Sequence, residues 1–127
     1  MQTIDHEREK LDQWRPGVMT RMRISALNGA AQLCVFEQFV EPGTGAPTHY
    51  HTVEEVLTVL EGQADIWIEA EHATLAAGQS TIIPPHQRHG FQNIGQTTLH
   101  VQAILAAPIF EASFDDQTET RRRWAAA

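Results

Sequence analysis

Two short runs with fixed spacing constrain this chain more than any other feature of its sequence. They are GTGAPTHYHTVEEVLTVLEG at residues 43–62 and GQSTIIPPHQRHGFQN at residues 78–93. The fixed positions of the first run are Gly43, His49, His51, Glu55 and Gly62, and those of the second are Gly78, Pro84, His89 and Asn93. The glycines indicate tight turns with positive φ, and the proline indicates the end of a strand, where a missing N–H costs little.

In their spacing the two runs resemble the paired motifs of the cupin superfamily, G(X)5HXH(X)3E(X)6G and G(X)5PXG(X)2H(X)3N. One position departs from that pattern, because His86 stands where the second motif has glycine. The resemblance implies an all-β fold, a single antiparallel jelly-roll β-barrel in one domain, 1–127, with a core of roughly 30–108, an N-terminal extension (1–29) and a C-terminal tail (109–127). It also implies one metal site, whose ligands would be His49, His51, Glu55 and His89.

The spacing of the two neighbouring histidines suits a metal ion. On an extended strand His49 and His51 share one face, with Cα atoms about 6–7 Å apart. Glu55 has the same parity but would lie roughly 13 Å beyond His51 on a straight strand, so the chain must turn between them or Glu55 must sit on a neighbouring strand. A helix is the alternative, because residues at i and i+4 share a helical face. The Val-Leu-Thr-Val-Leu that follows favours a strand.

Three imidazoles and one carboxylate suit one divalent transition metal, with Fe, Mn, Ni, Co, Zn and Cu all open. Four ligands on an octahedral ion leave two positions for a substrate, or for a substrate and O2. We therefore expect a metal-dependent enzyme that acts on a small organic molecule, with oxygenase chemistry favoured and isomerase or lyase chemistry next. The alternative is a non-catalytic small-molecule-binding or sensor protein.

His86 has two interpretations. As a turn residue it would use the positive φ that histidine tolerates. As an accessory group, its imidazole would stand near the metal and act as an acid, a base or a hydrogen-bond donor. The turn interpretation is favoured, since the glycine of the family points into a turn and not toward the metal.

Outside the two runs, strand-like segments alternate with turn signals, as in an all-β sandwich or barrel. Asn28-Gly29 predicts a hairpin turn. A short helix broken by Pro16-Gly17 is expected in the polar opening, and another at the end of the charged tail. Three polar strand residues can face the cavity, although their faces are not assigned: Arg23, Glu37 and Gln102.

The charge and composition of the chain restrict the classes of partner and the location that we expect. The net charge of −7 argues against nucleic acid, and the basic run Arg121–Arg123 is interpreted as a solvated tail or an intersubunit contact. No apolar run approaches the roughly 20 residues that span a membrane, and the charged opening lacks a signal peptide, so we expect a cytoplasmic protein. The lone Cys34 predicts a buried thiol. We also expect a homodimer in which Met22–Ala26 covers a sheet edge of a second chain.

Overall fold

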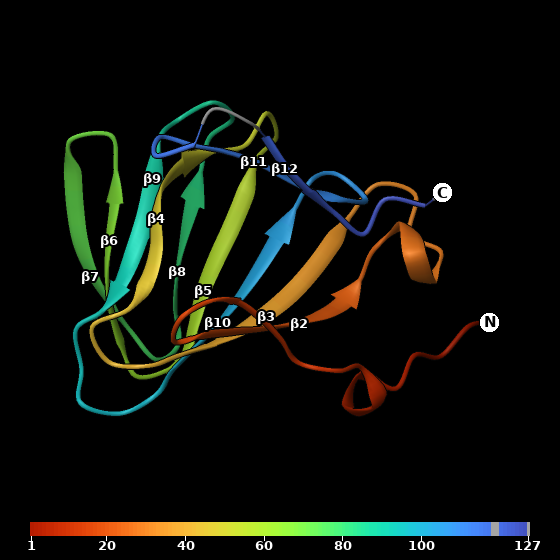
Figure 1. Cartoon of the computed structure of the whole chain (residues 1–127), viewed down its shortest axis with the longest axis horizontal. Helices are drawn as coiled ribbons and strands as arrows, with labels where there is room; N and C mark the ends of the chain where they lie inside the picture. Colours follow the sequence, from red (N-terminus) through yellow and green to blue (C-terminus); the bar gives the residue numbers. More distant parts are fainter. Residues whose placement is uncertain (118–119, 127) are drawn as a thin grey trace.

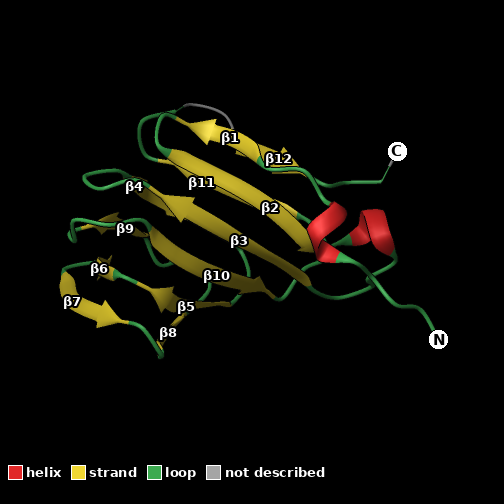
Figure 2. Cartoon of the chain, turned by 90° about the horizontal axis from the view of Figure 1, so that it is seen from below, coloured by secondary structure: helices red, strands yellow, loops and turns green. Residues whose placement is uncertain are grey.

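Two six-stranded antiparallel sheets face each other in the computed structural model of the chain, which describes residues 1–117 and 120–126 (Figures 1 and 2). The strands are β1 (Asp12–Arg15), β2 (Val18–Ile24), β3 (Cys34–Val40), β4 (Gly45–Tyr50), β5 (Glu55–Glu61), β6 (Gln63–Ile68), β7 (Glu71–Ala76), β8 (Gln79–Ile83), β9 (His89–Asn93), β10 (Leu99–Leu105), β11 (Phe110–Phe114) and β12 (Thr120–Arg123). Two 3-10 helices, η1 (His6–Arg8) and η2 (Ala26–Asn28), complete the regular elements. The predicted all-β jelly-roll fold is confirmed.

Successive strands of the central part of the chain change sheet repeatedly. Sheet A has the order β1-β2-β3-β10-β5-β8, and sheet B has the order β12-β11-β4-β9-β6-β7. The chain thus passes from β4 in sheet B directly to β5 in sheet A. As a result, residues that are close in sequence come to face each other across the space between the sheets.

The core fills the space between the two sheets, and strand alternation decides which side chains enter it. On β10, Leu99, Val101, Ala103 and Leu105 are buried, whereas the residues between them are only half-buried. Phe36 and Val40 on β3 are buried in the same core. A fully buried Val, Leu or Phe side chain stabilises the fold by about 1.5–3 kcal/mol relative to the exposed side chain.

The turn residues of the two runs lie where they were predicted. Gly43, Gly62 and Gly78 have φ of 80°, 90° and 87°, which side chains with a Cβ rarely adopt. At Gly62, between β5 and β6, an added Cβ would also lie 3.2 Å from Cα of Leu99. Pro84 follows the last residue of β8, so its missing N–H interrupts no strand.

The N-terminal segment differs from the expectation. Pro16-Gly17 joins β1 to β2 as a hairpin, and the helix before it is the three-residue η1. Asn28 and Gly29 do not form a two-residue hairpin, because they belong to η2, which begins with a capping box of Ser25 and Asn28 and ends at Gly29. None of the helices in the described part of the chain combines the length and apolar character needed to cross a membrane.

The C-terminal segment also differs, since it forms strands and not a helix. On β11, Phe110, Ala112 and Phe114 are buried and alternate with half-buried residues. This period of two is that of a strand with one face in the core. The extensions 1–29 and 109–127 therefore contribute β1, β2, β11 and β12 to the two sheets.

Candidate metal centre

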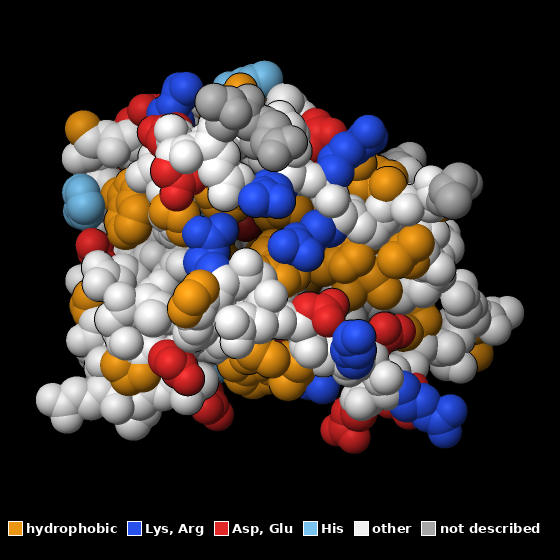
Figure 3. Space-filling model, in the orientation of Figure 1, with side chains coloured by type: hydrophobic (Ala, Val, Ile, Leu, Met, Phe, Trp, Pro, Cys, Tyr) orange, Lys and Arg blue, Asp and Glu red, His pale blue; other side chains and the backbone are white. Residues whose placement is uncertain are grey.

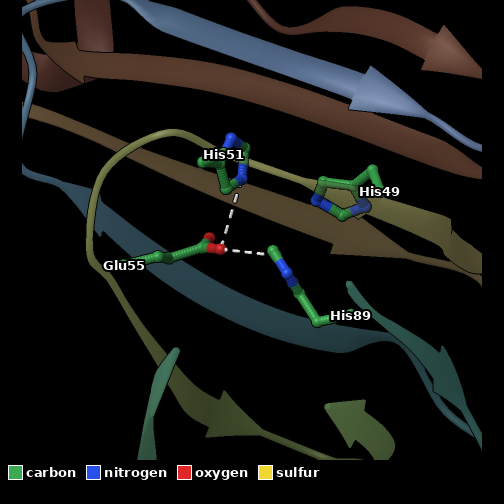
Figure 4. A group of neighbouring side chains, drawn as sticks. All are labelled: His49, His51, Glu55 and His89. Atoms are coloured by element: carbon green, nitrogen blue, oxygen red, sulfur yellow. Dashed lines mark hydrogen bonds and ion pairs between the residues drawn. The ribbon is translucent and has the colours of Figure 1, made fainter. Parts of the chain in front are cut away.

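Three elements bring the four predicted ligands together (Figure 4). His49 lies on β4 with His51 just beyond its end, Glu55 begins β5, and His89 begins β9. His49 and His89 are cross-strand neighbours in sheet B. Glu55 comes from sheet A, where it pairs with Ile83 of β8. The carboxylate therefore faces the imidazoles across the space between the sheets.

The passage from β4 to β5 explains how Glu55 reaches the histidines. The backbone turns over residues 51–54 as the chain crosses between sheets, and it forms no helix there. The turn is held by two backbone bonds, from His86 N to His51 O at 2.7 Å and from Ala106 N to Glu54 O at 3.1 Å. The predicted turn is confirmed, and the helical alternative is not adopted.

The geometry of the cluster fits a metal ion. One ligand atom from each of His49, His51, Glu55 and His89 lies within 4.8 Å of the other three, and all four residues are buried. Ligands at about 2.1 Å from one ion lie at most about 4.2 Å apart. Small movements of the side chains therefore suffice to close the set around an ion.

The far side of each imidazole is anchored to the backbone. The Nδ1 atoms of His49, His51 and His89 lie 2.7, 2.7 and 2.9 Å from the carbonyl oxygens of Pro47, Glu111 and Gln87. A carbonyl oxygen only accepts a hydrogen bond, so each Nδ1 carries a proton. Each Nε2 is therefore left to face the centre, which is the arrangement typical of metal-binding histidines.

Glu55 supplies the negative charge at the centre. Its Oε1 lies 2.9 Å from Nε2 of His89 and 3.3 Å from Nε2 of His51. Burial alone would raise the pKa of Glu55, but the two imidazoles lower it well below its usual range. For His51 the two effects have the opposite sign: burial would lower its pKa, but the Glu55 carboxylate raises it. A divalent cation bound here would take the place of the protons that these contacts attract.

His49 differs from the other two histidines. Burial, followed by the nearby His89 and His51, lowers its pKa to about 3. Its imidazole is therefore neutral near pH 7, with a free lone pair on Nε2.

The cluster lines one side of a cavity of about 30 Å³. The other walls are mainly apolar and include Phe36, Leu57, Phe91 and Phe110. This space holds about two water molecules. Polar interactions in a cavity that holds so little water are stronger than in bulk water. This favours recognition of a small ligand at the centre.

His86 and Asn93 support the site from outside the four-residue cluster. His86 has φ of 68°, is exposed and lies outside the four-residue cluster. Asn93 is a buried strand residue, and not the turn residue that its type indicates. Its Nδ2 donates to Val40 O and Thr97 O at 2.9 and 2.8 Å, and its Oδ1 accepts from Gly95 N at 2.9 Å. It thus ties the end of β9 to its neighbours.

Arg23, Glu37 and Gln102, which the sequence did not assign to either face of a strand, do not line the cavity. Glu37 accepts bonds from Nε of Arg23 and Arg21 at 2.9 and 3.0 Å, and Arg23 Nη1 donates to Gln102 Oε1 at 3.1 Å. On β3, Glu37 alternates with Phe36 and Gln38, which line the cavity. The network therefore lies on the outer face of sheet A.

Three residues that line the cavity carry no recognisable signal in the sequence. Trp14 and Arg15 come from β1, and Phe114 from the end of β11. Both strands lie outside the two motif runs. Cys34 is buried as predicted, and burial raises the pKa of its thiol to about 12, which leaves it protonated.

Comparison with known proteins assigns the family. The family described as "Cupin domain" matches residues 36–105. The chain therefore belongs to the cupin superfamily, as the two motif runs predicted.

Two relatives with descriptive names are longer than this chain. It is 29% identical over 126 residues to Auxin-binding protein 1 of Arabidopsis thaliana, with 87% of this chain and 63% of that protein covered. It is 32% identical over 96 residues to the polyketide synthase CurC of Streptomyces cyaneus, with 72% of this chain and 60% of that protein covered. The chain thus spans somewhat less than two thirds of each relative.

Solved structures with low sequence identity share the fold. An RmlC-like cupin from Shewanella frigidimarina has a TM-score of 0.70 and 22% identity, with 80% of this chain and 86% of that chain covered. The oxalate decarboxylase of Lactobacillus farciminis, in a formate complex, has a TM-score of 0.78 and 20% identity, with 86% and 34% covered. These similarities concern the architecture of the barrel.

Proposed function

We propose that this cupin is a metal-dependent enzyme that acts on a small organic molecule. His49, His51, Glu55 and His89 would hold one divalent transition metal. The observation that carries the proposal is the orientation of the cluster, because backbone carbonyls fix all three Nδ1 atoms and leave each Nε2 directed inward. Metal-binding histidines typically donate their other ring N–H in this way, which fixes the tautomer and directs Nε2 to the ion.

A metal ion bound there would polarise the oxygen atoms of a substrate as a Lewis acid. The residues of the chain perform the remaining tasks. The imidazoles present neutral donors, and Glu55 offsets part of the positive charge of the ion. The apolar walls, among them Phe36 and Phe91, limit water and so strengthen the interaction between charge and substrate.

Oxygenase chemistry is favoured within this proposal, followed by isomerase or lyase chemistry. The nitrogen-rich donor set suits redox-active metals as well as zinc. Solved structures similar to this fold include oxalate decarboxylases and a recombinant oxalate oxidase in complex with glycolate. Proteins with this fold thus include enzymes that act on small organic acids, which supports a catalytic role without identifying the substrate here.

A non-catalytic role in binding a small molecule is the second candidate. Auxin-binding protein 1, whose name describes binding and not turnover, is similar over 87% of this chain. The same buried cluster would then hold a ligand without converting it.

Turnover separates the two candidates. The protein, loaded separately with Fe(II), Mn(II), Ni(II) or Zn(II), is incubated with a panel of small carboxylic acids, diketones and phenols, and products are followed by mass spectrometry and an oxygen electrode. Turnover that is lost in His89→Ala and kept in His72→Ala supports the enzyme, since His72 is exposed and lies outside the cluster. Saturable binding without product supports the binding protein. Turnover that survives in both variants would contradict the proposed metal centre.

A further inference from the structure

Three arginines of this acidic chain gather at one end of the sandwich. Arg15 ends β1 at the edge of sheet A, whereas Arg121 and Arg123 lie on β12 at the edge of sheet B. Figure 2 shows these two edge strands close together, and the rings of Trp14 and Trp124 lie 5.5 Å apart. Figure 3 shows basic side chains over the middle of one face, with hydrophobic side chains between and beside them.

These arginines line a cleft beside the cavity that the four-residue cluster lines. The cleft has a volume of about 180 Å³ and is also lined by Trp14, Phe114 and Gln117. Trp14, Arg15 and Phe114 line the metal cavity too, so cleft and cavity adjoin. The ring of Phe114 stacks on His49 at 4.8 Å, and the guanidinium of Arg15 lies 4.9 Å from the centre of the same ring. One aromatic ring therefore separates Arg15 from a predicted metal ligand.

Among the described residues, the three cleft arginines form no salt bridge, although Asp116 acts on Arg15 and Asp12 on Arg123 at longer range. Among residues 1–117 and 120–126, no carboxylate oxygen lies within 4.0 Å of a side-chain nitrogen of Arg15, Arg121 or Arg123. Arg122 on the same strand behaves differently, since its Nε lies 3.1 Å from Oε2 of Glu111. The cleft thus concentrates positive charge in a chain whose net charge is −7.

Packing holds two of the arginines in place. Arg15 and Arg123 are both half-buried, and the guanidinium of Arg123 lies 4.2 Å from the centre of the Trp14 ring. Burial lowers the pKa of Arg15, with Asp116 opposing and Arg123 and Arg121 adding to the effect. Like charges held together and partly removed from water are stabilised by an anion, which guanidinium groups bind through paired hydrogen bonds.

We infer that this cleft binds the anionic group of a small organic substrate, a carboxylate or a phosphate, through Arg15 and Arg123. The neighbouring Trp14 and Phe114 would pack against the apolar part of that substrate. The cleft adjoins the cavity, so a substrate held here would present its reacting end to the four-residue cluster. This last step rests on the proposed function, whereas recognition of the anion does not.

The test measures binding of benzoate, phenyl phosphate and the uncharged benzamide by isothermal titration calorimetry, on metal-free and metal-loaded protein. The variants are Arg15→Gln and Arg123→Gln, with Arg122→Gln as the matched control on the same strand. Benzoate or phenyl phosphate should bind more tightly than benzamide, and loss of either cleft arginine should weaken binding of the anion about 10-fold or more. The Arg122→Gln variant should bind as the parent does, and circular dichroism checks that each variant folds.

The outcomes separate this inference from the metal proposal. Tighter binding of phenyl phosphate than of benzoate assigns the anion as a phosphate, and the reverse assigns a carboxylate. Binding by metal-free protein that depends on Arg15 and Arg123 supports the cleft even if the cluster holds no metal. The inference is overturned if benzamide binds as well as benzoate, if neither anion binds the parent at millimolar concentration, or if binding is lost in His89→Ala and kept in both cleft variants. In the last case the metal would bind the anion by itself.

Discussion

Oε1 of Glu55 and Nε2 of His89 lie 2.9 Å apart in the interior, although 34 positions separate the two residues in sequence. Nδ1 of His89 already donates to the Gln87 carbonyl, so this contact needs either a further proton between the two atoms or a cation in its place. Protons and metal therefore compete for the same position. This competition leads to the first prediction.

Metal affinity should fall on acidification, with fewer than three protons taken up per ion released near pH 6. Burial would lower the pKa of His51, but the Glu55 carboxylate raises it above the ordinary imidazole value of about 6.5. A proton on His51 therefore begins to compete with the metal ion at a pH above that value. The pKa of His49 is about 3, so that ring stays neutral near pH 6. Competition with a chromophoric chelator between about pH 8 and pH 5 measures the slope of log affinity against pH. A slope of three, or no loss of affinity by pH 5, would contradict this.

Glu37 should make stability depend on pH in the acid range. Burial would raise its pKa, but hydrogen bonds from Arg23, His100 and Arg21 lower it to about 2. The stabilisation is therefore complete above the unfolded pKa of about 4.3 and is lost as the pH falls toward 2. Glu37→Gln should cost about 1–3 kcal/mol at pH 7, and the cost should shrink between about pH 5 and pH 3.

Urea denaturation of metal-free protein at several pH values measures that cost. Glu111→Gln is the matched control, because Glu111 forms a more exposed ion pair with Arg122 and should change stability by less than about 1 kcal/mol. A cost for Glu37→Gln that stays constant from pH 7 to pH 3 would rule out the depressed pKa.

His86→Gly should leave metal binding intact and stabilise the fold slightly. The backbone of His86 has φ of 68°, and its exposed ring lies outside the cluster. Glycine relieves the left-handed conformation, for a net gain of about 0.5–1 kcal/mol. His86→Ala, which keeps the strain and removes the ring, is the control. Thermal unfolding and metal content are measured together, and loss of metal in both variants would instead assign an accessory role to the imidazole.

A homodimer remains a prediction, and the structure offers two surfaces for it. β1 pairs only with Val18–Thr20 of β2, so β1 leaves the outer edge of Met22–Ile24 uncovered, as the predicted strand pairing requires. A second candidate surface is an apolar row that crosses the outer face of sheet A through aligned cross-strand pairs. Its members are Val35, Ile104, Val56 and Ile82, and Ile82 is 63% exposed. A second copy packed on this row would remove apolar surface from water.

Ile82→Glu should therefore convert the dimer to a monomer in light scattering. Gln92→Glu adds the same charge on an exposed residue of sheet B and should leave the dimer intact. A parent protein that stays monomeric as its concentration rises, or a dimer unaffected by Ile82→Glu, would exclude this interface.

The sequence predicted the four clustered residues because their spacing follows strand geometry and the turns between strands. His49 and His51 share a face, and Gly43 and Gly62 mark turns that need positive φ. It did not predict the carbonyl that anchors His51, since Glu111 lies 60 positions further on and contributes only its backbone. A contact made by the main chain leaves no trace in residue identity.

Strands β1, β11 and β12 were missed for a different reason. Charged residues dominate the tail, so the alternation of Phe110, Ala112 and Phe114 was hidden by composition. Arg15 precedes a Pro-Gly turn in a polar segment, and nothing local indicates that it reaches the cavity. Its position depends on the pairing of β1 with β2 at the edge of sheet A, which is a property of the whole fold.

The metal content of the purified protein tests the central claim most directly. The parent, purified without chelators and then saturated with metal, should hold about one ion per chain by elemental analysis. His89→Ala and Glu55→Gln should lose most of that metal while keeping the β-sheet signal in circular dichroism. His72→Ala, which removes an exposed imidazole, should keep it. A folded His89→Ala variant that binds metal as well as the parent would contradict the metal centre proposed here.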